Sequence, residues 1–294
     1  MNASAGRPHG LGTSREISLA AGSVRYFENG PAEGPVVLFV HGLLVNADLW
    51  RNVVPEVARA GFRTLAVDWP LGSHQLPMPR ADFSPPGMAD LIASFLEEMD
   101  IRDVTVVAND TGGALTQILM TRHPDRIGRV VLTPSDAFTR FLPPMFALLP
   151  QLAKVPGGTW LIVRAMQFGV VQRLPMAFGR LAKRPMPRET LNSYVQPSRD
   201  DPKIRHDLRS FLRQVHRRHT LAAAGQLHTF TRPVLLAWAP EDTHFPIELA
   251  ERLAAVLPSA TISRIDDSLT FVPEDQPLVL ARLVTRFATN NAAT

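Results

Sequence analysis

The stretch VVANDTGG, residues 106–113, leads from an apolar segment into a run of small residues and places Asp110 at the corner between them. A side chain raised on a strand-to-helix corner needs small neighbours, and Gly112 and Gly113 provide them. The stretch therefore predicts a nucleophile at Asp110, with the N–H of Thr111 able to stabilise a developing anion at the helix start. The alternative is an ordinary strand-turn-helix in which Asp110 caps the helix.

Short aliphatic runs recur along the chain and alternate with helical patterns. The runs are GPVVLFVHG, FRTLAVD, DVTVVAND, RVVLTPSD, RPVLLAWAPED and ATISRID, and an antiparallel hairpin around Ala21 and Gly22 precedes them. Helical patterns cover 47–60, 87–99, 112–122 and 246–256, and a last helix begins near Pro277. Continuous apolar strands separated by helices are typical of a parallel sheet buried on both faces, so we predict an α/β fold.

The alternation stops between residues 137 and 231, where only helical patterns occur, rich in Pro, Met and Leu. We predict a helical cap over residues 137–231, laid across the strand ends of a core formed by residues 1–136 and 232–294. Inside the cap, residues 203–219 carry six Lys or Arg and one Asp, with apolar residues at helical spacing. This pattern predicts an amphipathic helix with a solvated basic face; a rim for phosphate or an acidic substrate is the alternative.

The composition excludes several classes of protein. The chain has no cysteine, so disulfides, thiolate metal sites and cysteine nucleophiles are excluded. Its 31 basic and 27 acidic residues leave a mild net charge of +4, which does not favour nucleic-acid binding. No segment offers about 18 uninterrupted apolar residues, and the polar opening lacks the apolar stretch of a signal peptide. We expect a cytoplasmic protein with no membrane partner, no metal and no cofactor; the oligomeric state is not predicted.

Two further motifs follow buried strands. In FVHGLL, residues 39–44, the N–H of Leu43 is placed to form the other half of an oxyanion hole, while His41 is expected to support the loop structurally. In AWAPEDTHFP, Asp242 follows a strand and precedes a helix that Pro starts. That carboxylate either orients a histidine or caps the helix.

Together these motifs resemble the α/β-hydrolase superfamily, from about residue 15 to the end of the chain. The resemblance implies a mostly parallel eight-stranded sheet with helices on both faces and an inserted helical cap. An aspartate nucleophile is similar to the branch that contains haloalkane dehalogenases and epoxide hydrolases. There, Asp110 would attack carbon and form an alkyl ester, Asp242 would be the acid, and the amides of Leu43 and Thr111 would form the oxyanion hole.

The sequence departs from this family at the histidine. The family histidine follows the last strand, and the 28-residue interval after Asp242 places Thr270 there. A threonine hydroxyl does not titrate near neutral pH, so it cannot take a proton from water. His244 and His74 lie in loops that border the predicted site and are alternative bases, although a structural role is expected for each. Asp136, after the sixth core strand, is an alternative acid.

Two more departures bear on the substrate. Haloalkane dehalogenases hold the halide with a Trp after the nucleophile and a second donor, whereas Thr111 and Leu43 stand here. Epoxide hydrolases use two cap tyrosines, and of Tyr26 and Tyr194 only the second falls in the predicted cap.

Three functions remain open. The first is a hydrolase-family enzyme acting on a small to medium apolar substrate through Asp110. The second is a catalytically silent member that keeps the pocket for a ligand or a protein partner. The third is isomerase-type or lyase-type proton transfer by Asp110, whose pKa would be raised by burial beside Asp242.

Overall fold

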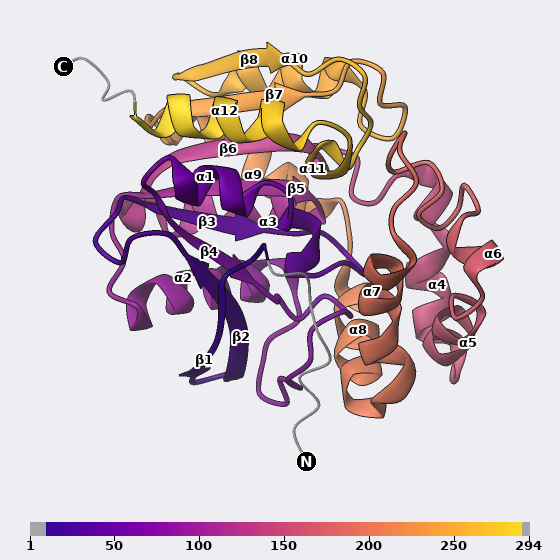
Figure 1. Cartoon of the computed structure of the whole chain (residues 1–294). Coiled ribbons are helices and arrows are strands. Elements are labelled where there is room, and N and C mark those ends of the chain that lie inside the picture. The colour runs from indigo at the N-terminus through magenta and orange to yellow at the C-terminus, as the bar shows by residue number, and fades with distance from the viewer. Residues whose placement is uncertain (1–9, 290–294) are drawn as a thin grey trace.

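The computed structural model describes residues 10–289, and its centre is an eight-stranded sheet (Figure 1). The strands lie in the order β1-β2-β4-β3-β5-β6-β7-β8. Their bounds are β1 Thr13–Leu19, β2 Gly22–Asn29, β3 Val36–Val40, β4 Arg63–Val67, β5 Val104–Asp110, β6 Ile127–Ser135, β7 Val234–Trp238 and β8 Ala260–Arg264. Strand β2 pairs antiparallel with β1 and β4, and the pairs from β4 to β8 are parallel. The predicted α/β fold with a mostly parallel eight-stranded sheet is confirmed.

The apolar runs of the sequence form the middle of this sheet. Residues 37–40 of β3, 104–109 of β5 and all of β7 are buried, as expected for strands covered on both faces. Strand β8 lies at the edge of the sheet and is largely accessible to solvent. Because β3 and β5 are parallel neighbours, with Val40 opposite Ala108, the loops that follow both strands lie at the same end of the sheet.

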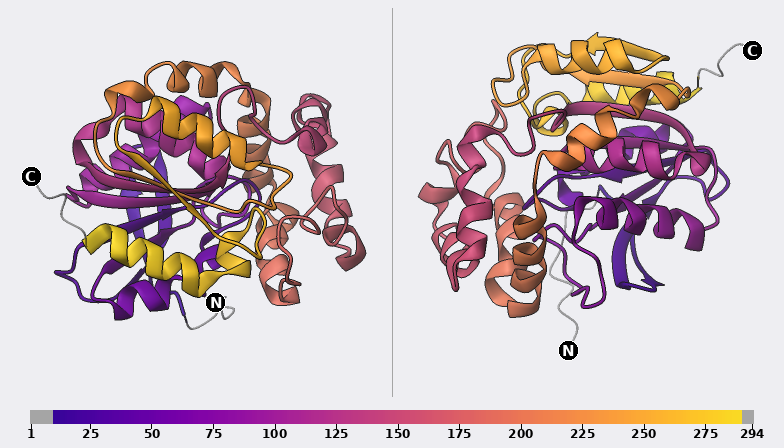
Figure 2. Two further views of the ribbon diagram at one scale, coloured as in Figure 1. Left: turned by 90° about the horizontal axis from the view of Figure 1, so that it is seen from above. Right: turned by 180° about the vertical axis from the view of Figure 1, so that it is seen from behind.

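Helices cover both faces of the sheet (Figure 2). On one face, α1 (Val54–Arg59) packs against α12 (Pro277–Thr289), which follows the short α11 (Val272–Asp275). On the other face, α2 (Pro85–Glu98) packs against α3 (Thr111–Arg122), and α10 (Ile247–Val256) contacts β7 and β8. The helix predicted over 47–60 is divided into the 3-10 helix η1 (Ala47–Trp50) and α1, because Asn46 caps the first and Pro55 starts the second.

Between β6 and β7 the described chain contains only helices. These are η3 (Pro144–Phe146), α4 (Leu148–Lys154), α5 (Gly158–Ala165), α6 (Gly169–Gln172), α7 (Arg188–Asp200), α8 (Pro202–Gln214), α9 (Arg218–Ala224) and η4 (Leu227–Thr229). Helices α4 to α8 project beyond the carboxyl ends of the strands (Figure 1), whereas α9 and η4 pack on α3 of the core. The range predicted as the cap therefore includes a C-terminal part that packs on helix α3 of the core.

Helix α8 is the predicted basic amphipathic helix. It buries Ile204, Leu208, Phe211 and Leu212 and ends at Gln214, so the last residues of the predicted range lie outside it. Among residues 10–289, no helix is both long and apolar enough to cross a membrane.

Candidate functional site

Asp110 is the last residue of β5, and α3 begins at the next residue. Its φ of 56° and ψ of −132° lie in a region that residues with a side chain rarely adopt, so the corner is strained. The two glycines that follow explain why the corner is possible. A Cβ on Gly112 would lie 2.5 Å from the carbonyl oxygen of His41, and a Cβ on Gly113 would lie 2.3 Å from the Ser135 Cβ. Only a residue without a side chain fits at either position.

Two backbone amides point at the Asp110 carboxylate. The N–H groups of Leu43 and Thr111 both donate hydrogen bonds to it. The loop after β3 lies close to this carboxylate, because a Cβ on Gly42 would be 2.2 Å from Asp110 Oδ2. The two predicted oxyanion amides and the predicted nucleophile are therefore adjacent.

The Asp110 carboxyl group lies deep in the protein, and the part of the residue that remains accessible faces a cavity under the cap. Burial raises its pKa to about 7, the N–H of Thr111 lowers the pKa, and the negative charge of Asp242 raises it further. Near neutral pH both the protonated and the ionised form of Asp110 are therefore populated, which suits either nucleophilic attack or proton transfer.

Asp242 lies in the loop after β7 and contacts Thr270. The Thr270 hydroxyl donates to Asp242 Oδ2 at 2.8 Å, and the N–H of His244 donates to Oδ1 at 2.8 Å. Burial raises the pKa of Asp242 to about 6, and the hydrogen bonds from His244 and Thr270 lower it. The carbonyl oxygen of Thr270 accepts a bond of 2.7 Å from Asn109, the neighbour of Asp110. Position 270 therefore lies between Asp242 and the corner, and it is occupied by a hydroxyl that cannot act as a base.

Asp136, the alternative acid, is also buried beside the corner. Its Oδ2 accepts a bond of 3.2 Å from the Thr111 hydroxyl, and its Oδ1 accepts one of 2.7 Å from the N–H of Leu142. Burial and the charge of Asp110 both raise the pKa of Asp136 well above its usual value. Thr111 thus links two carboxyl groups, through its N–H to Asp110 and through its hydroxyl to Asp136.

Sequence reasoning missed two residues that shape this region. Asn109 is fully buried, and its amide donates to the Thr133 hydroxyl at 2.8 Å as well as to position 270. Its place next to Asp110 was the available signal. Arg140, in the loop after β6, lowers the pKa of both Asp136 and Asp242 and donates to the carbonyl oxygen of His244. No sequence pattern marked it.

The three histidines considered from the sequence have different surroundings. His41 Nε2 accepts from the N–H of Trp69 at 2.9 Å, and Nδ1 lies 2.9 Å from the carbonyl oxygen of Gly42, so its ring supports the loop. His74 Nε2 lies 3.1 Å from Asp207 Oδ2, and Nδ1 accepts from a backbone N–H at 3.3 Å. Both nitrogens of these two rings are thus occupied, in His41 by loop groups and in His74 by a loop N–H and a side chain of α8.

His244 is different from the other two, because its buried Nε2 has no hydrogen-bond partner. Burial lowers its pKa, and the charges of Arg140 and Arg180 lower it further, so the ring is neutral at pH 7. The ring lies 5.8 Å, centre to centre, from Phe146, which lines the cavity over Asp110. His244 therefore stands behind the cavity wall rather than in it.

The cavity over Asp110 has a volume of about 210 Å³. Of the 17 described residues that line it, 16 are apolar, and Asp110 is the other. The walls come from Leu43 and Leu44 after β3 and from the cap helices, and they hold no Trp or Asn. Tyr194 is fully buried with its ring 5.7 Å from that of Phe178, a wall residue, and is itself absent from the wall.

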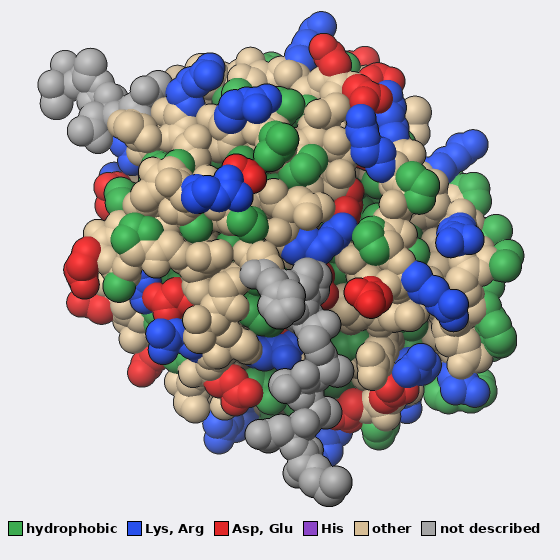
Figure 3. Space-filling model, in the orientation of Figure 1, with side chains coloured by type: hydrophobic (Ala, Val, Ile, Leu, Met, Phe, Trp, Pro, Cys, Tyr) green, Lys and Arg blue, Asp and Glu red, His purple; other side chains and the backbone are tan. Residues whose placement is uncertain are grey.

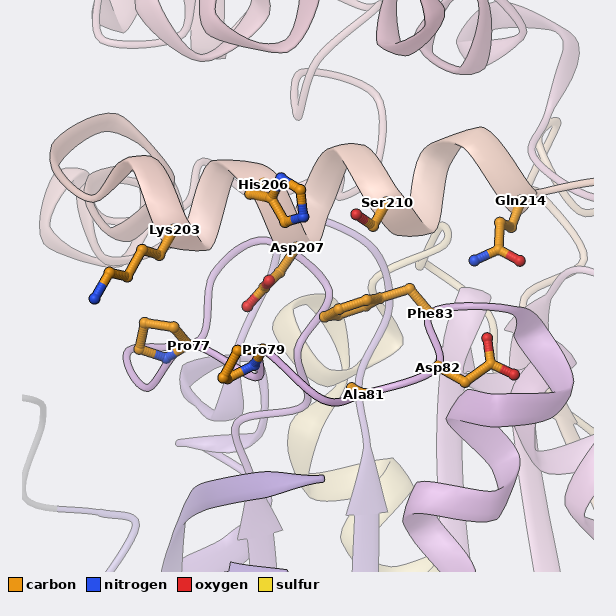
Figure 4. A pocket seen from close by; sticks show the side chains of 10 residues that line it. All are labelled: Pro77, Pro79, Ala81, Asp82, Phe83, Lys203, His206, Asp207, Ser210 and Gln214. Atoms are coloured by element: carbon orange, nitrogen blue, oxygen red, sulfur yellow. The ribbon is translucent and has the colours of Figure 1, made fainter. Parts of the chain in front are cut away.

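A larger cavity of about 670 Å³ lies between residues 77–83 and α8 (Figure 4). It is lined by polar side chains such as Lys203 and His206, and Asp207 points into it while binding His74 and the N–H of Met78. None of the site residues predicted from the sequence line this cavity. Among residues 10–289 no group of three or more His, Asp or Glu side chains is arranged to hold a metal ion.

The chain was compared with known proteins. Residues 35–277 match the family model described as alpha/beta hydrolase fold. A haloalkane dehalogenase from Mesorhizobium japonicum is 36% identical over 130 residues, which span 43% of this chain and 41% of that enzyme. A haloalkane dehalogenase from Psychrobacter cryohalolentis is 25% identical over 278 residues, 91% of this chain and 88% of the enzyme.

Solved structures share the fold. The crystal structure of the haloalkane dehalogenase DbeA from Bradyrhizobium elkani has a TM-score of 0.78 and 22% sequence identity, covering 94% of this chain and 97% of that one. A lipase-like protein from Acinetobacter baumannii gives a TM-score of 0.77 at 18% identity, covering 94% and 90%. The family match over most of the chain and the eight-stranded sheet agree: this protein belongs to the α/β-hydrolase fold family.

Proposed function

We propose that this protein is an α/β-hydrolase-family enzyme in which Asp110 attacks an electrophilic carbon of a small to medium apolar substrate. One carboxylate oxygen forms a bond to that carbon, and the bond from the carbon to its leaving group breaks with the electron pair on the leaving group. The product is an alkyl ester of Asp110. The observation that carries this proposal is a single carboxyl group, held by two amides, at the base of an otherwise apolar cavity.

The amides of Leu43 and Thr111 support both halves of such a reaction. They bind the carboxylate in the free protein, and the same N–H groups would stabilise the oxyanion formed when water attacks the ester carbonyl. Curated relatives named haloalkane dehalogenases add support for a substrate with a leaving group on carbon.

Hydrolysis of the ester needs a base, and position 270 does not supply one. The Thr270 hydroxyl donates its hydrogen bond to Asp242 and does not titrate near neutral pH. A water molecule that attacks the ester therefore finds no base at the position of the family histidine. We expect the ester to form faster than it is hydrolysed.

The cavity wall also limits the leaving group. Because the described wall offers no side-chain N–H donor, a departing halide gains no hydrogen bond from a side chain. An epoxide oxygen likewise gains no proton from Tyr194, which is buried outside the wall. The proposal therefore favours substrates with a good leaving group, such as bromides and iodides.

A burst measurement tests the proposal. The protein is mixed with a panel of alkyl bromides, alkyl iodides, epoxides and activated esters, and the released halide or acid is counted per protein molecule. Epoxides release no group when the ring opens, so they are followed by the mass added to the protein. We expect rapid release of about one equivalent followed by slow turnover. Asp110→Asn should abolish the burst; an equal burst from this variant would refute the role of Asp110.

The pKa of Asp110, raised to about 7, favours a second candidate, proton transfer without an ester. That function would exchange a substrate proton with solvent, so deuterium from heavy water would enter the substrate while no burst occurs. If every compound in the panel is unchanged and an apolar ligand binds tightly, the cavity serves binding alone.

A further inference from the structure

The outer surface of the cap is unusually apolar. Twelve large hydrophobic side chains are exposed among the described residues, and nine of them fall within residues 145–176. The most exposed are Val170, Met176 and Leu148, at 76%, 64% and 62%. We call the surface formed by the exposed side chains of residues 145–176 the cap face. An exposed apolar surface of this kind on one part of a protein marks an interaction site.

The same part of the chain is cationic. Residues 137–188 contain eight Lys or Arg and no Asp or Glu, although the whole chain has 31 basic and 27 acidic residues. Lys183 and Arg184 pair with carboxylates of the core. On the cap face, Lys154 donates to the Gln151 side chain, and Arg164 lies over the Trp160 ring and lowers the pKa of Asp200 through its charge. Figure 3 shows basic and hydrophobic side chains together over this end of the molecule, at the right of the view.

Helix α5 combines both properties on one side. Trp160, Leu161 and Arg164 are all exposed, and Arg164 follows Trp160 by four residues and Leu161 by three, which makes it the neighbour of both on the helix surface. The Arg164 guanidinium lies 5.8 Å from the centre of the Trp160 ring. An aromatic ring and a basic side chain beside exposed aliphatic groups are typical of helices that lie in the interface of a bilayer.

We propose that the cap face docks on an anionic lipid bilayer. Exposed apolar side chains enter the headgroup region, and basic side chains meet the lipid phosphates. A second copy of this chain fits the cap face less well, because two basic surfaces without acidic residues would then face each other. This peripheral contact needs no membrane-spanning helix; it would revise the prediction that the protein has no membrane partner.

Docking would also orient the cavity over Asp110. Met145, Leu148 and Met176 line that cavity and are themselves exposed on the cap face, so the mouth of the cavity opens there. An apolar compound dissolved in the bilayer would then enter the cavity without crossing water. Docking itself is independent of the proposed chemistry, and only this delivery of substrate rests on it.

Trp160 provides a direct probe of docking. The chain has four tryptophans, of which Trp50, Trp69 and Trp238 are fully buried, while Trp160 is 51% exposed. The full chain is titrated with vesicles of phosphatidylcholine alone or mixed with phosphatidylglycerol, and its fluorescence is recorded. We expect the emission to shift to shorter wavelength with the mixed vesicles, and the binding to weaken as salt is added. The absence of a shift at low salt would overturn the proposal.

Vesicle sedimentation with matched variants locates the contact. Phe168→Ser should weaken binding about tenfold by removing one apolar side chain, and Lys154→Gln about fivefold by removing one charge. The controls Leu278→Ser and Arg282→Gln change exposed residues of α12, outside the cap face, and should bind like the parent. Equal losses in the controls would overturn the proposal. So would sedimentation velocity that shows a dimer which Phe168→Ser dissociates, because the occupant of the cap face would then be a second copy.

Discussion

Replacing Asp110 with Asn is expected to stabilise the protein, and more so at alkaline pH. The pKa of Asp110 is raised from 3.8 to about 7, mainly by burial. A carboxyl group whose pKa is higher in the folded than in the unfolded state binds its proton more tightly when folded. Its contribution to stability is therefore greatest below pH 3.8 and is lost as the pH rises to about 7.

The size of the effect follows from the two pKa values. A shift of about three pKa units corresponds to a cost of about 4 kcal/mol once Asp110 is ionised in the folded state. Between pH 5 and pH 8 the parent should lose about 3 kcal/mol through this group, whereas Asp110→Asn has no proton to lose. The neutral amide keeps an oxygen for the N–H groups of Leu43 and Thr111, so the gain is not cancelled by lost hydrogen bonds.

Urea denaturation at pH 5 and pH 8, with parent and variant side by side, measures this difference. We expect the free energy of unfolding of Asp110→Asn to exceed that of the parent by about 3 kcal/mol more at pH 8 than at pH 5. The exposed Asp103, which precedes β5 at the end opposite to Asp110, gives the control Asp103→Asn, for which no such widening is expected because its side chain is not buried. A difference between Asp110→Asn and the parent that does not change with pH would refute the burial of an ionisable Asp110.

Three further predictions concern the reaction. The rate of alkylation of Asp110 by a reactive alkyl bromide should rise about 50-fold from pH 5 to pH 7, because the ionised fraction of Asp110 grows from about 1% to about half. Mass spectrometry of quenched samples gives this rate. A rate that does not change with pH would exclude the carboxylate as the nucleophile. Gly42→Ala places a Cβ 2.2 Å from Asp110 Oδ2 and should slow alkylation at least about 100-fold, since small misplacements of reacting groups are costly. Gly169→Ala, which meets no atom within 4 Å, is its matched control and should react at the parental rate. Thr270→His should turn the single burst into repeated halide release, because an imidazole next to Asp242 can accept a proton from water. The control Thr270→Val supplies no base and should release one equivalent only. Repeated release by the parent would indicate another base, and His244 would be the first to test.

The sheet and the corner were predictable because both depend on local patterns. Uninterrupted apolar runs mark strands buried on two faces, and the pair of glycines after Asp110 marks a place where backbone and side chains approach within van der Waals limits. The pairing of Asp242 with Thr270 was predicted from the resemblance to the α/β-hydrolase superfamily, whose histidine follows the last strand. The two residues meet because both lie in loops after neighbouring parallel strands.

Other features could not be predicted from the sequence, because they depend on which element a helix packs against and on which groups contact a side chain in the folded protein. A helical pattern shows that α9 has an apolar side, but not that this side packs on α3 instead of on the cap. One nitrogen of His74 accepts from the N–H of Gly72 in its own loop, and the other is occupied by Asp207 of α8, a contact that no spacing in the sequence indicates. Arg140 acts on Asp136 and Asp242 through space, and its single basic side chain in a loop carries no periodic signal.

The central claim is that Asp110 becomes covalently bonded to the substrate carbon, and peptide mass spectrometry tests it most directly. After reaction with an alkyl bromide, trypsin should release residues 103–122 as one peptide that contains Asp103 and Asp110 as its two carboxyl side chains. We predict that fragmentation places the added alkyl mass on Asp110, and that Asp110→Asn yields the unmodified peptide. Consumption of the bromide with no added mass, or with the mass on Asp103, would contradict the proposed role of Asp110.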